Sequence, residues 1–133
     1  GIQHPREPRP LASLPLRDGE AIGTSGDYQR FFEMDGERYC HLLDPRSGRP
    51  ARGTQAVTVL ITPRPTGSTP AGTLSDAASK PVYLGGDAWR DYARRFGIDH
   101  ALRVDADGRI QVTRALHDRL QYGDGIPPPS IVD

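Results

Sequence analysis

The chain has 133 residues, which suits one modest domain or part of a larger one. Its 17 basic and 17 acidic residues give no net charge, and the basic residues are spread along the chain, which argues against binding a nucleic acid backbone. The single cysteine, Cys40, excludes an internal disulfide and a cysteine-based zinc cluster, and no apolar run is long enough to span a bilayer.

The first half of the sequence predicts short strands joined by turns, in keeping with the 15 glycines and 13 prolines of the chain. Asp35-Gly36 lies between two apolar stretches, which is the strongest short-range signal of a hairpin. The β-branched run "QAVTVLIT" is the clearest strand. The predicted strands are Leu11–Leu16, Ala21–Ser25, Arg30–Met34, Glu37–Leu43 and Gln55–Thr62.

The second half predicts two helices and a further hairpin. The first helix covers Leu74–Leu84, and we expect it to end or kink near Lys80, because Pro81 removes a hydrogen bond and clashes with the preceding turn. Aromatic residues at helical spacing in "DAWRDYARRF" predict the second helix over Asp87–Phe96. The remaining segments are strands at 101–104 and 110–113, a short helix or turn at 114–120, and an extended or disordered tail at 123–133.

This order of elements predicts an α+β domain over residues 1–122, with a mostly antiparallel sheet and two helices packed on it. The sequence begins abruptly, with Ile2 ready to join a strand, so we expect the protein to continue upstream of residue 1. Such a piece would need an N-terminal half or a second copy to cover its exposed sheet edges.

A histidine stands where the apolar run ends in "RYCHLLDPRSGRP". His41 at this place could hold a neutral imidazole at the rim of a sheet, where general bases act. Composition alone favours the other interpretation, a histidine whose hydrogen bond is satisfied by a local carbonyl. Asp44 follows at the turn and could orient either the turn or the imidazole. Cys40 points to the opposite face of the strand and is expected to be a small buried residue.

Two further places carry groups that could bind a ligand. The hydroxyls and backbone of Thr24, Ser25 and Gly26 could cradle a phosphate or a carbonyl, or form an ordinary turn or helix cap. Asp76 is a normal oxygen ligand for a hard cation and Lys80 a normal point charge for phosphate, although an Asp also helps to start a helix.

Taken together and in order, these segments resemble the C-terminal half of the ApbE family, the FAD:protein FMN transferases once called thiamine-biosynthesis lipoproteins. The family carries "A-x-x-T-S-G-D/N-Y", "H-I-I-D-P-x-T-G-x-P" and a helix start "A-D-A-x-A-T". This chain is similar at Thr24–Tyr28, His41–Pro50 and Ser75–Lys80, and the resemblance runs from about residue 1 to 121. It implies part of an ApbE-like, T-fold-like domain.

The resemblance implies transfer of FMN from FAD to a Ser or Thr hydroxyl of an acceptor flavoprotein, with release of AMP and usually with Mg²⁺. By position, His41 resembles the general base, Asp76 the metal-binding carboxylate, and Thr24-Ser25-Gly26 a segment of the flavin site. The family's N-terminal half, which supplies much of the FAD pocket, has no counterpart in this sequence, so the chain alone is expected to be inactive. The family suggests the periplasmic side of a bacterial cell envelope, although it also admits cytoplasmic members.

One position departs from the family pattern. Lys80 stands where the family has a threonine, and a protonated lysine cannot ligate a cation as a hydroxyl does. Lys80 favours a second interpretation, a non-catalytic flavin-binding or scaffold relative that has lost the metal, whereas His41 with Asp76 favours the enzyme. Residues four apart share a helix face, so we expect Lys80 to pair with Asp76 and to replace part of the role of Mg²⁺.

Overall fold

The structure is a computed structural model that describes all residues from 1 to 133. Its centre is a five-stranded sheet with the order β12-β10-β9-β8-β3, in which all neighbours are antiparallel except β10 and β12. These results confirm the predicted α+β class and the mostly antiparallel sheet. The strands are β3 Ala21–Gly26, β8 Thr54–Ile61, β9 His100–Asp105, β10 Ile110–Thr113 and β12 Ser130–Val132.

Strand β8 is buried along its whole length because both faces of the sheet are covered. Val57 and Val59 belong to a cluster of buried residues on the helix side of the sheet, which we call the helix-side cluster. Ala56 and Leu60 belong to a second cluster on the opposite face. The alternation follows from strand geometry, in which successive side chains point to opposite faces.

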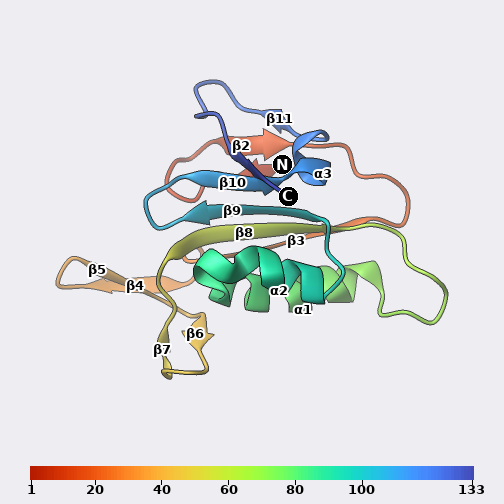
Figure 1. Cartoon of the computed structure of the whole chain (residues 1–133). Helices are drawn as coiled ribbons and strands as arrows, with labels where there is room; N and C mark the ends of the chain where they lie inside the picture. The colour runs from red at the N-terminus through yellow and green to blue at the C-terminus, as the bar shows by residue number, and fades with distance from the viewer.

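Two helices lie along one face of the sheet and against each other (Figure 1). They are α1 Ala71–Leu84 and α2 Trp89–Arg95, and a 3₁₀ turn, η1 Gly86–Ala88, precedes α2. The first helix packs on β3 and β8 through residues spaced by three and four, which places them on one stripe. The buried residues of α1 are Ser75, Ala78, Ser79, Val82 and Tyr83.

The sequence predicts that this helix ends or kinks near Lys80, and the first of these two outcomes is wrong. The helix continues through Pro81 to Leu84, and the Gly85 N–H donates to the Pro81 carbonyl at 3.0 Å. The two residues after the proline are buried in the helix-side cluster. Burying each side chain contributes about 1.5–3 kcal/mol, which offsets a cost of about 3 kcal/mol for a proline inside a helix.

A smaller sheet covers the opposite face of the central sheet. Its strands are β1 Ile2–Gln3, β2 Pro10–Ser13 and β11 Gln121–Tyr122, and a short helix, α3 Arg114–His117, lies beside it. Strand β2 ends two residues before Pro15, which has no N–H for a ladder. The predicted tail is extended at Ser130–Val132, where it pairs with β10, and Ile126 and Ile131 pack on the second cluster.

Two hairpins extend beyond the sheet (Figure 1). The φ angles of Asp35 and Gly36 are 52° and 77°, and two positive values are what a two-residue type I′ turn requires, so the predicted hairpin is confirmed. Phe32 is 59% exposed and stacks on Tyr39 with ring centroids 5.0 Å apart. The strands of the two hairpins are β4 Phe31–Met34 and β5 Glu37–Cys40, then β6 Leu43–Asp44 and β7 Arg49–Pro50.

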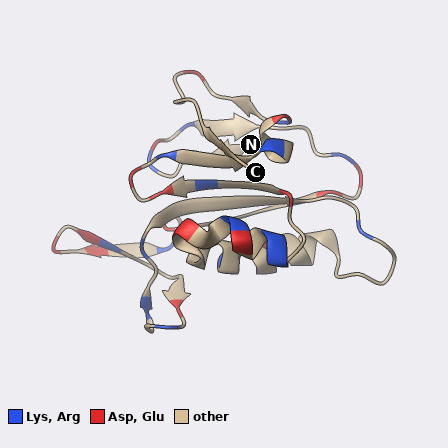
Figure 2. Ribbon diagram, viewed as in Figure 1, with Lys and Arg blue, Asp and Glu red and all other residues tan.

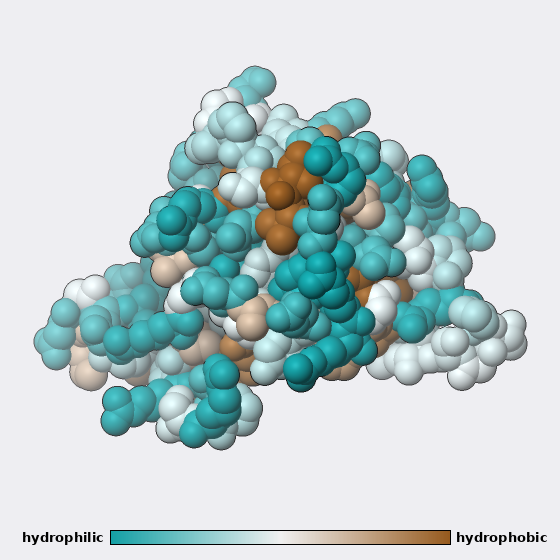
Figure 3. Space-filling view, viewed as in Figure 1, coloured by the Kyte–Doolittle hydropathy of each residue, from teal (hydrophilic) through white to brown (hydrophobic).

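The surface is mixed in charge and mostly hydrophilic. Figure 2 shows basic and acidic residues distributed over the helices, the loops and both hairpins. Figure 3 shows small, separate hydrophobic areas on an otherwise hydrophilic face. None of the helices combines the length and the apolar character needed to cross a membrane.

Candidate functional site

His41 follows directly after β5 and is held by one backbone carbonyl. Its main-chain N–H donates to the Arg30 carbonyl oxygen at 3.0 Å, and its ring Nδ1 lies 3.2 Å from the same oxygen. Because a carbonyl oxygen only accepts, this second contact is a hydrogen bond when Nδ1 carries the proton. In the neutral ring, that tautomer leaves Nε2 free to accept a proton, and the residue is exposed to solvent.

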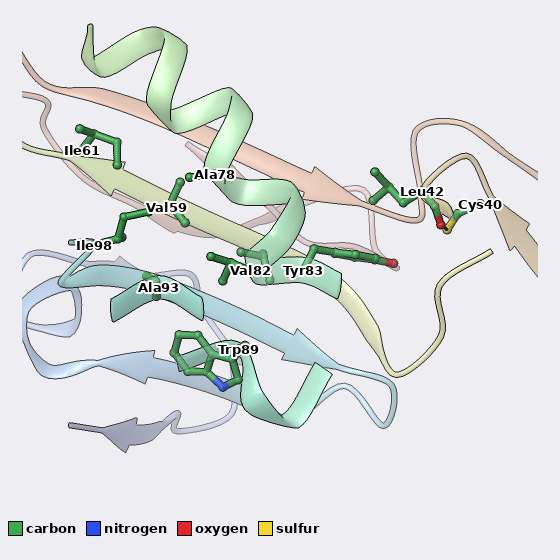
Figure 4. Packing of buried hydrophobic residues seen from close by; sticks show 12 residues of the cluster. Cys40, Leu42, Val59, Ile61, Ala78, Val82, Tyr83, Trp89, Ala93 and Ile98 are labelled. Carbon is green, nitrogen blue, oxygen red and sulfur yellow. Dashed lines mark hydrogen bonds between the residues drawn. The ribbon is translucent and has the colours of Figure 1, made fainter. Parts of the chain in front are cut away.

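The two neighbours of His41 anchor it to the fold. Cys40 and Leu42 are 6% and 7% exposed and belong to the helix-side cluster, whereas His41 between them is exposed. Figure 4 shows Tyr83 of α1 extending toward these two residues. Burial on both sides fixes the backbone, so the imidazole occupies a defined place at the base of the β4–β5 hairpin.

Asp44 holds the turn rather than the imidazole. Its carboxylate accepts from the Arg46 backbone N–H and from the Arg46 guanidinium, each at 2.9 Å. Its main-chain oxygen accepts from the N–H groups of Ser47 and Gly48, and Gly48 has a φ of 68°. The hydrogen bonds from Arg46 hold the pKa of the Asp44 carboxyl below its usual range. The sequence left two roles open for Asp44, orientation of the turn or of the imidazole, and these contacts support orientation of the turn.

The residues Thr24, Ser25 and Gly26 do not face one common point, because they alternate along β3. The exposed Thr24 hydroxyl lies 2.9 Å from the Thr58 hydroxyl, on the face away from α1 and α2. The buried Ser25 Oγ lies 2.8 Å from the Ser79 Oγ of α1. Gly26 ends the strand, where an added Cβ would lie 2.7 Å from Cδ1 of the Tyr28 ring. Only Ser25 of the three therefore contacts the helix that carries Asp76.

A glycine sets the close approach of β3 to α1. A Cβ added to Gly23 would collide with the Ser75 carbonyl oxygen and lie 2.6 Å from the Ser75 carbonyl carbon. Gly23 and Ser25 are two residues apart and so point to the same face of the sheet. The missing side chain of Gly23 thus lets Ser25 and Ser79 come within hydrogen-bond distance.

Asp76 and Lys80 form a closed pair on the exposed side of α1. Lys80 Nζ donates to Asp76 Oδ1 at 2.8 Å and to the Asp76 main-chain oxygen at 2.9 Å. The Ser79 hydroxyl donates to the same main-chain oxygen at 2.9 Å. The Asp76 side chain is 83% exposed and that of Lys80 is 44% exposed. The ammonium therefore lies against two oxygens of one residue.

These residues do not fit a divalent cation. No group of three or more His, Cys, Asp and Glu side chains gathers in the structure. Two oxygens of Asp76 that a cation would use are already occupied by the Lys80 ammonium. At 4 Å and an effective dielectric near 20, that ammonium repels each unit of positive charge by about 4 kcal/mol, and a divalent ion by twice as much. The Lys80 ammonium thus occupies the position at Asp76 that a metal ion would have to bind.

Two hollows of the surface are relevant to the site residues, and Asp44 lines one of them. One of about 730 Å³ lies between the two hairpins and is lined by residues such as Tyr39, Asp44 and Arg52. A smaller one of about 150 Å³ is lined in part by Asp27, which accepts two hydrogen bonds from Arg6 at 2.6 and 2.7 Å. Neither hollow is lined by His41 or Asp76, and both of these residues are exposed to solvent.

Sequence reasoning missed two elements of this arrangement. It did not identify the Arg30 carbonyl as the partner of His41, because a backbone atom leaves no side-chain signal. It did not connect Ser79 with Ser25, which lie 54 positions apart. The spacing of small residues at 75, 78 and 79 was the available signal that α1 approaches a strand closely.

Comparisons of this chain with a family model, with curated sequences and with solved structures all point to one family. The ApbE family model matches residues 1–103. The FAD:protein FMN transferase of Rhodobacter capsulatus is 37% identical over 135 residues, which cover 99% of this chain and 24% of that protein. The ApbE protein of Thermotoga maritima aligns over 86% of this chain and 35% of its own, with 34% identity and a TM-score of 0.72.

A second solved structure, the apo form of the flavinyl transferase ApbE of Pseudomonas stutzeri, aligns over 80% of this chain and 32% of its own. Its identity is 33% and its TM-score is 0.57. This chain thus spans between about a quarter and a third of the length of the proteins that it matches.

Proposed function

The chain belongs to the ApbE family, and from this premise we propose that it forms the C-terminal part of an FAD:protein FMN transferase. The transfer moves FMN from FAD onto a Ser or Thr hydroxyl of an acceptor flavoprotein. The hydroxyl oxygen bonds to the phosphorus nearer the riboflavin, the bond from that phosphorus to the bridging oxygen breaks, and AMP leaves. The hydroxyl proton has to be taken up as the phosphoester forms.

The observation that carries this proposal is the state in which His41 is held. Its Nδ1 is directed at the Arg30 carbonyl, which leaves Nε2 as the free nitrogen of an exposed ring. A general base needs an unprotonated nitrogen within reach of a hydroxyl of another molecule. His41 Nε2 meets that need, and it takes the proton of the acceptor hydroxyl. The satisfied Nδ1 is also what a merely structural histidine would show, so activity has to decide between the two.

The segment Thr24-Ser25-Gly26 and the α1 residues around Asp76 form the part of the site nearest the FAD. Support comes from the Ser25–Ser79 hydrogen bond, which connects the two segments. In enzymes of phosphoryl transfer, Mg²⁺ neutralises the pyrophosphate when it is bound. Because the Asp76 region of this chain does not fit that ion, none of the steps proposed above depends on it.

The partners follow from the reaction and from the extent of the chain. FAD is the donor and a flavoprotein is the acceptor. The other two-thirds or more of a relative's length has no counterpart in this chain, and an N-terminal half or a second copy supplies the remaining FAD contacts. The exposed Phe32 and Met34 of the hairpin, at 59% and 53%, support such a neighbour. The family resemblance suggests the periplasmic side of a bacterial cell envelope as the site of action, and the cytoplasm is the alternative because the family has cytoplasmic members.

The alternative is a non-catalytic, flavin-binding or scaffold relative. The specific observation in its favour is the Asp76–Lys80 pair, which fills the place of a cation. Such a protein would keep the fold and bind FAD without transferring FMN.

The test is incubation of the complete polypeptide that carries this chain with FAD and an acceptor flavoprotein. Covalent flavin on the acceptor is measured by in-gel fluorescence, and release of AMP by chromatography. An acceptor whose target Thr or Ser is replaced by Ala is the matched control. Flavin on the native acceptor alone supports the transferase. FAD binding without any transfer, in EDTA or in Mg²⁺, refutes it and supports the scaffold.

A further inference from the structure

We infer that the Lys80 ammonium takes the place of a divalent cation and binds a phosphate group of FAD directly, so that this protein binds FAD without Mg²⁺. This inference rests on the proposed function, because it concerns the same ligand. It goes beyond that function by assigning a contact to the pyrophosphate to a residue of the chain.

The first argument is the place of the ammonium. Lys80 Nζ contacts one carboxylate oxygen and the main-chain oxygen of the same residue, Asp76, at 2.8 and 2.9 Å. Oxygen atoms of this kind are what a hard cation would bind, whereas the Ser79 hydroxyl is buried and hydrogen-bonded to Ser25 and to the Asp76 main-chain oxygen. The ammonium has therefore taken the coordination of a cation, with N–H groups instead of metal–oxygen bonds.

The second argument is the count of donors. An ammonium has three N–H donors and no acceptor. Two of the three are directed at Asp76, so one remains, and the side chain is 44% exposed. A phosphate oxygen can accept that third hydrogen bond, and charge-assisted hydrogen bonds of this kind are the strong ones.

The pair differs from an ordinary ion pair on a helix surface. Asp91 and Arg94 of α2 also form an exposed pair, at 3.2 Å, but the backbone oxygen that Arg94 contacts, at 2.6 Å, belongs to Asp133 and not to its carboxylate partner. The Lys80 ammonium is additionally fixed by a backbone oxygen of the helix. The Lys80 ammonium therefore meets a carboxylate oxygen and a backbone oxygen of one residue, within one turn of α1.

The Asp76–Lys80 pair also differs in charge from a metal site. Lysine and aspartate together have no net charge, whereas a carboxylate with a divalent ion keeps one positive charge. A variant that regains a metal-binding hydroxyl at position 80 should therefore bind FAD at least as tightly as the native protein once Mg²⁺ is added, and weakly without it.

The experiment measures the Kd of FAD by flavin fluorescence for the complete polypeptide, in EDTA and in Mg²⁺, and the binding of Mg²⁺ alone by calorimetry. The variants are Lys80→Met, which keeps the apolar stem without the charge, and Lys80→Thr, which restores a hydroxyl. Arg94→Met is the control, because it removes an exposed helical ion pair together with one side-chain hydrogen bond to a main-chain oxygen, that of Asp133. Melting temperatures of all variants report whether each one folds.

The native protein should bind FAD with the same Kd in both solutions, and Arg94→Met should match it. Lys80→Met should bind FAD about tenfold more weakly in EDTA, as loss of one charged hydrogen bond implies. Lys80→Thr should bind FAD weakly in EDTA and recover in Mg²⁺, and it should bind Mg²⁺ in calorimetry, where the native protein does not.

The inference is overturned if the native protein loses about tenfold in FAD affinity in EDTA and regains it with Mg²⁺, or if Lys80→Met binds FAD as tightly as the native protein in EDTA. Both results leave the proposed function intact. A native protein that binds no FAD in either solution refutes the proposed function, and this inference with it.

Discussion

Replacing Gly23 by alanine tests whether the close approach of β3 to α1 positions the site. The new Cβ would lie 2.6 Å from the Ser75 carbonyl carbon, whereas ordinary contact starts at about 3.4 Å, so strand and helix must separate by about 0.8 Å or more. The obstacle is helix backbone, which has no alternative rotamer. Such overpacking costs about 1–3 kcal/mol, and the lower chain entropy of alanine returns about 0.4–1 kcal/mol.

We therefore expect Gly23→Ala to lower the free energy of unfolding by about 1–2 kcal/mol, measured by urea denaturation followed by circular dichroism. The 2.8 Å contact between Ser25 and Ser79 should lengthen, which moves the turn that carries Asp76. Gly72→Ala is the matched control, since nothing lies within 4 Å of its added Cβ, and it should gain about 0.5–1 kcal/mol as a helix substitution. Equal stability of Gly23→Ala and the native protein would refute the packing argument.

Three further outcomes are expected. Arg119 hydrogen-bonds Glu20 and lowers the pKa of that carboxyl from 4.5 to about 2. The stability that this ion pair provides is present above pH 4.5 and is lost as the pH falls toward 2. The free energy of unfolding of Glu20→Gln should therefore fall less steeply with acid than that of the native protein, and an equal fall contradicts this. Asp44→Ala removes the hydrogen bonds to Arg46 and should lower the melting temperature without shifting the pH dependence of flavin transfer, whereas a shifted profile would show that Asp44 acts on the imidazole. The buried Tyr83 hydroxyl has no hydrogen-bond partner, so Tyr83→Phe should leave the melting temperature equal or higher, and a large loss would reveal a missing partner.

The elements of the fold that the sequence predicted correctly are those determined by residues within the element itself. Asp35-Gly36 defines its own turn, since both residues adopt positive φ. The run at 55–62 predicts a buried strand from its composition alone. The predicted end of α1 near Lys80 was wrong for the opposite reason. The local effect of Pro81 is outweighed by the burial of Val82 and Tyr83 against a sheet that is formed by residues distant in sequence.

The same distinction holds for the candidate site. Asp76 and Lys80 are four residues apart on a helix, so their pairing follows from helix geometry and is present in the structure. The partner of His41 is the carbonyl of a residue eleven positions away, and the partner of Ser25 comes from α1. Both contacts depend on how strands and helix pack, which the sequence motifs do not encode by themselves.

The most direct test of the central claim, that His41 is the base of flavin transfer, measures FAD affinity and covalent transfer separately in His41→Ala of the complete polypeptide. His41 is exposed and its ring makes a hydrogen bond with the Arg30 carbonyl, so the melting temperature and the Kd of FAD should stay close to native. Covalent flavin on the acceptor should fall below detection. Transfer at the native rate would contradict the claim, and a large loss of stability would show instead that His41 serves the fold.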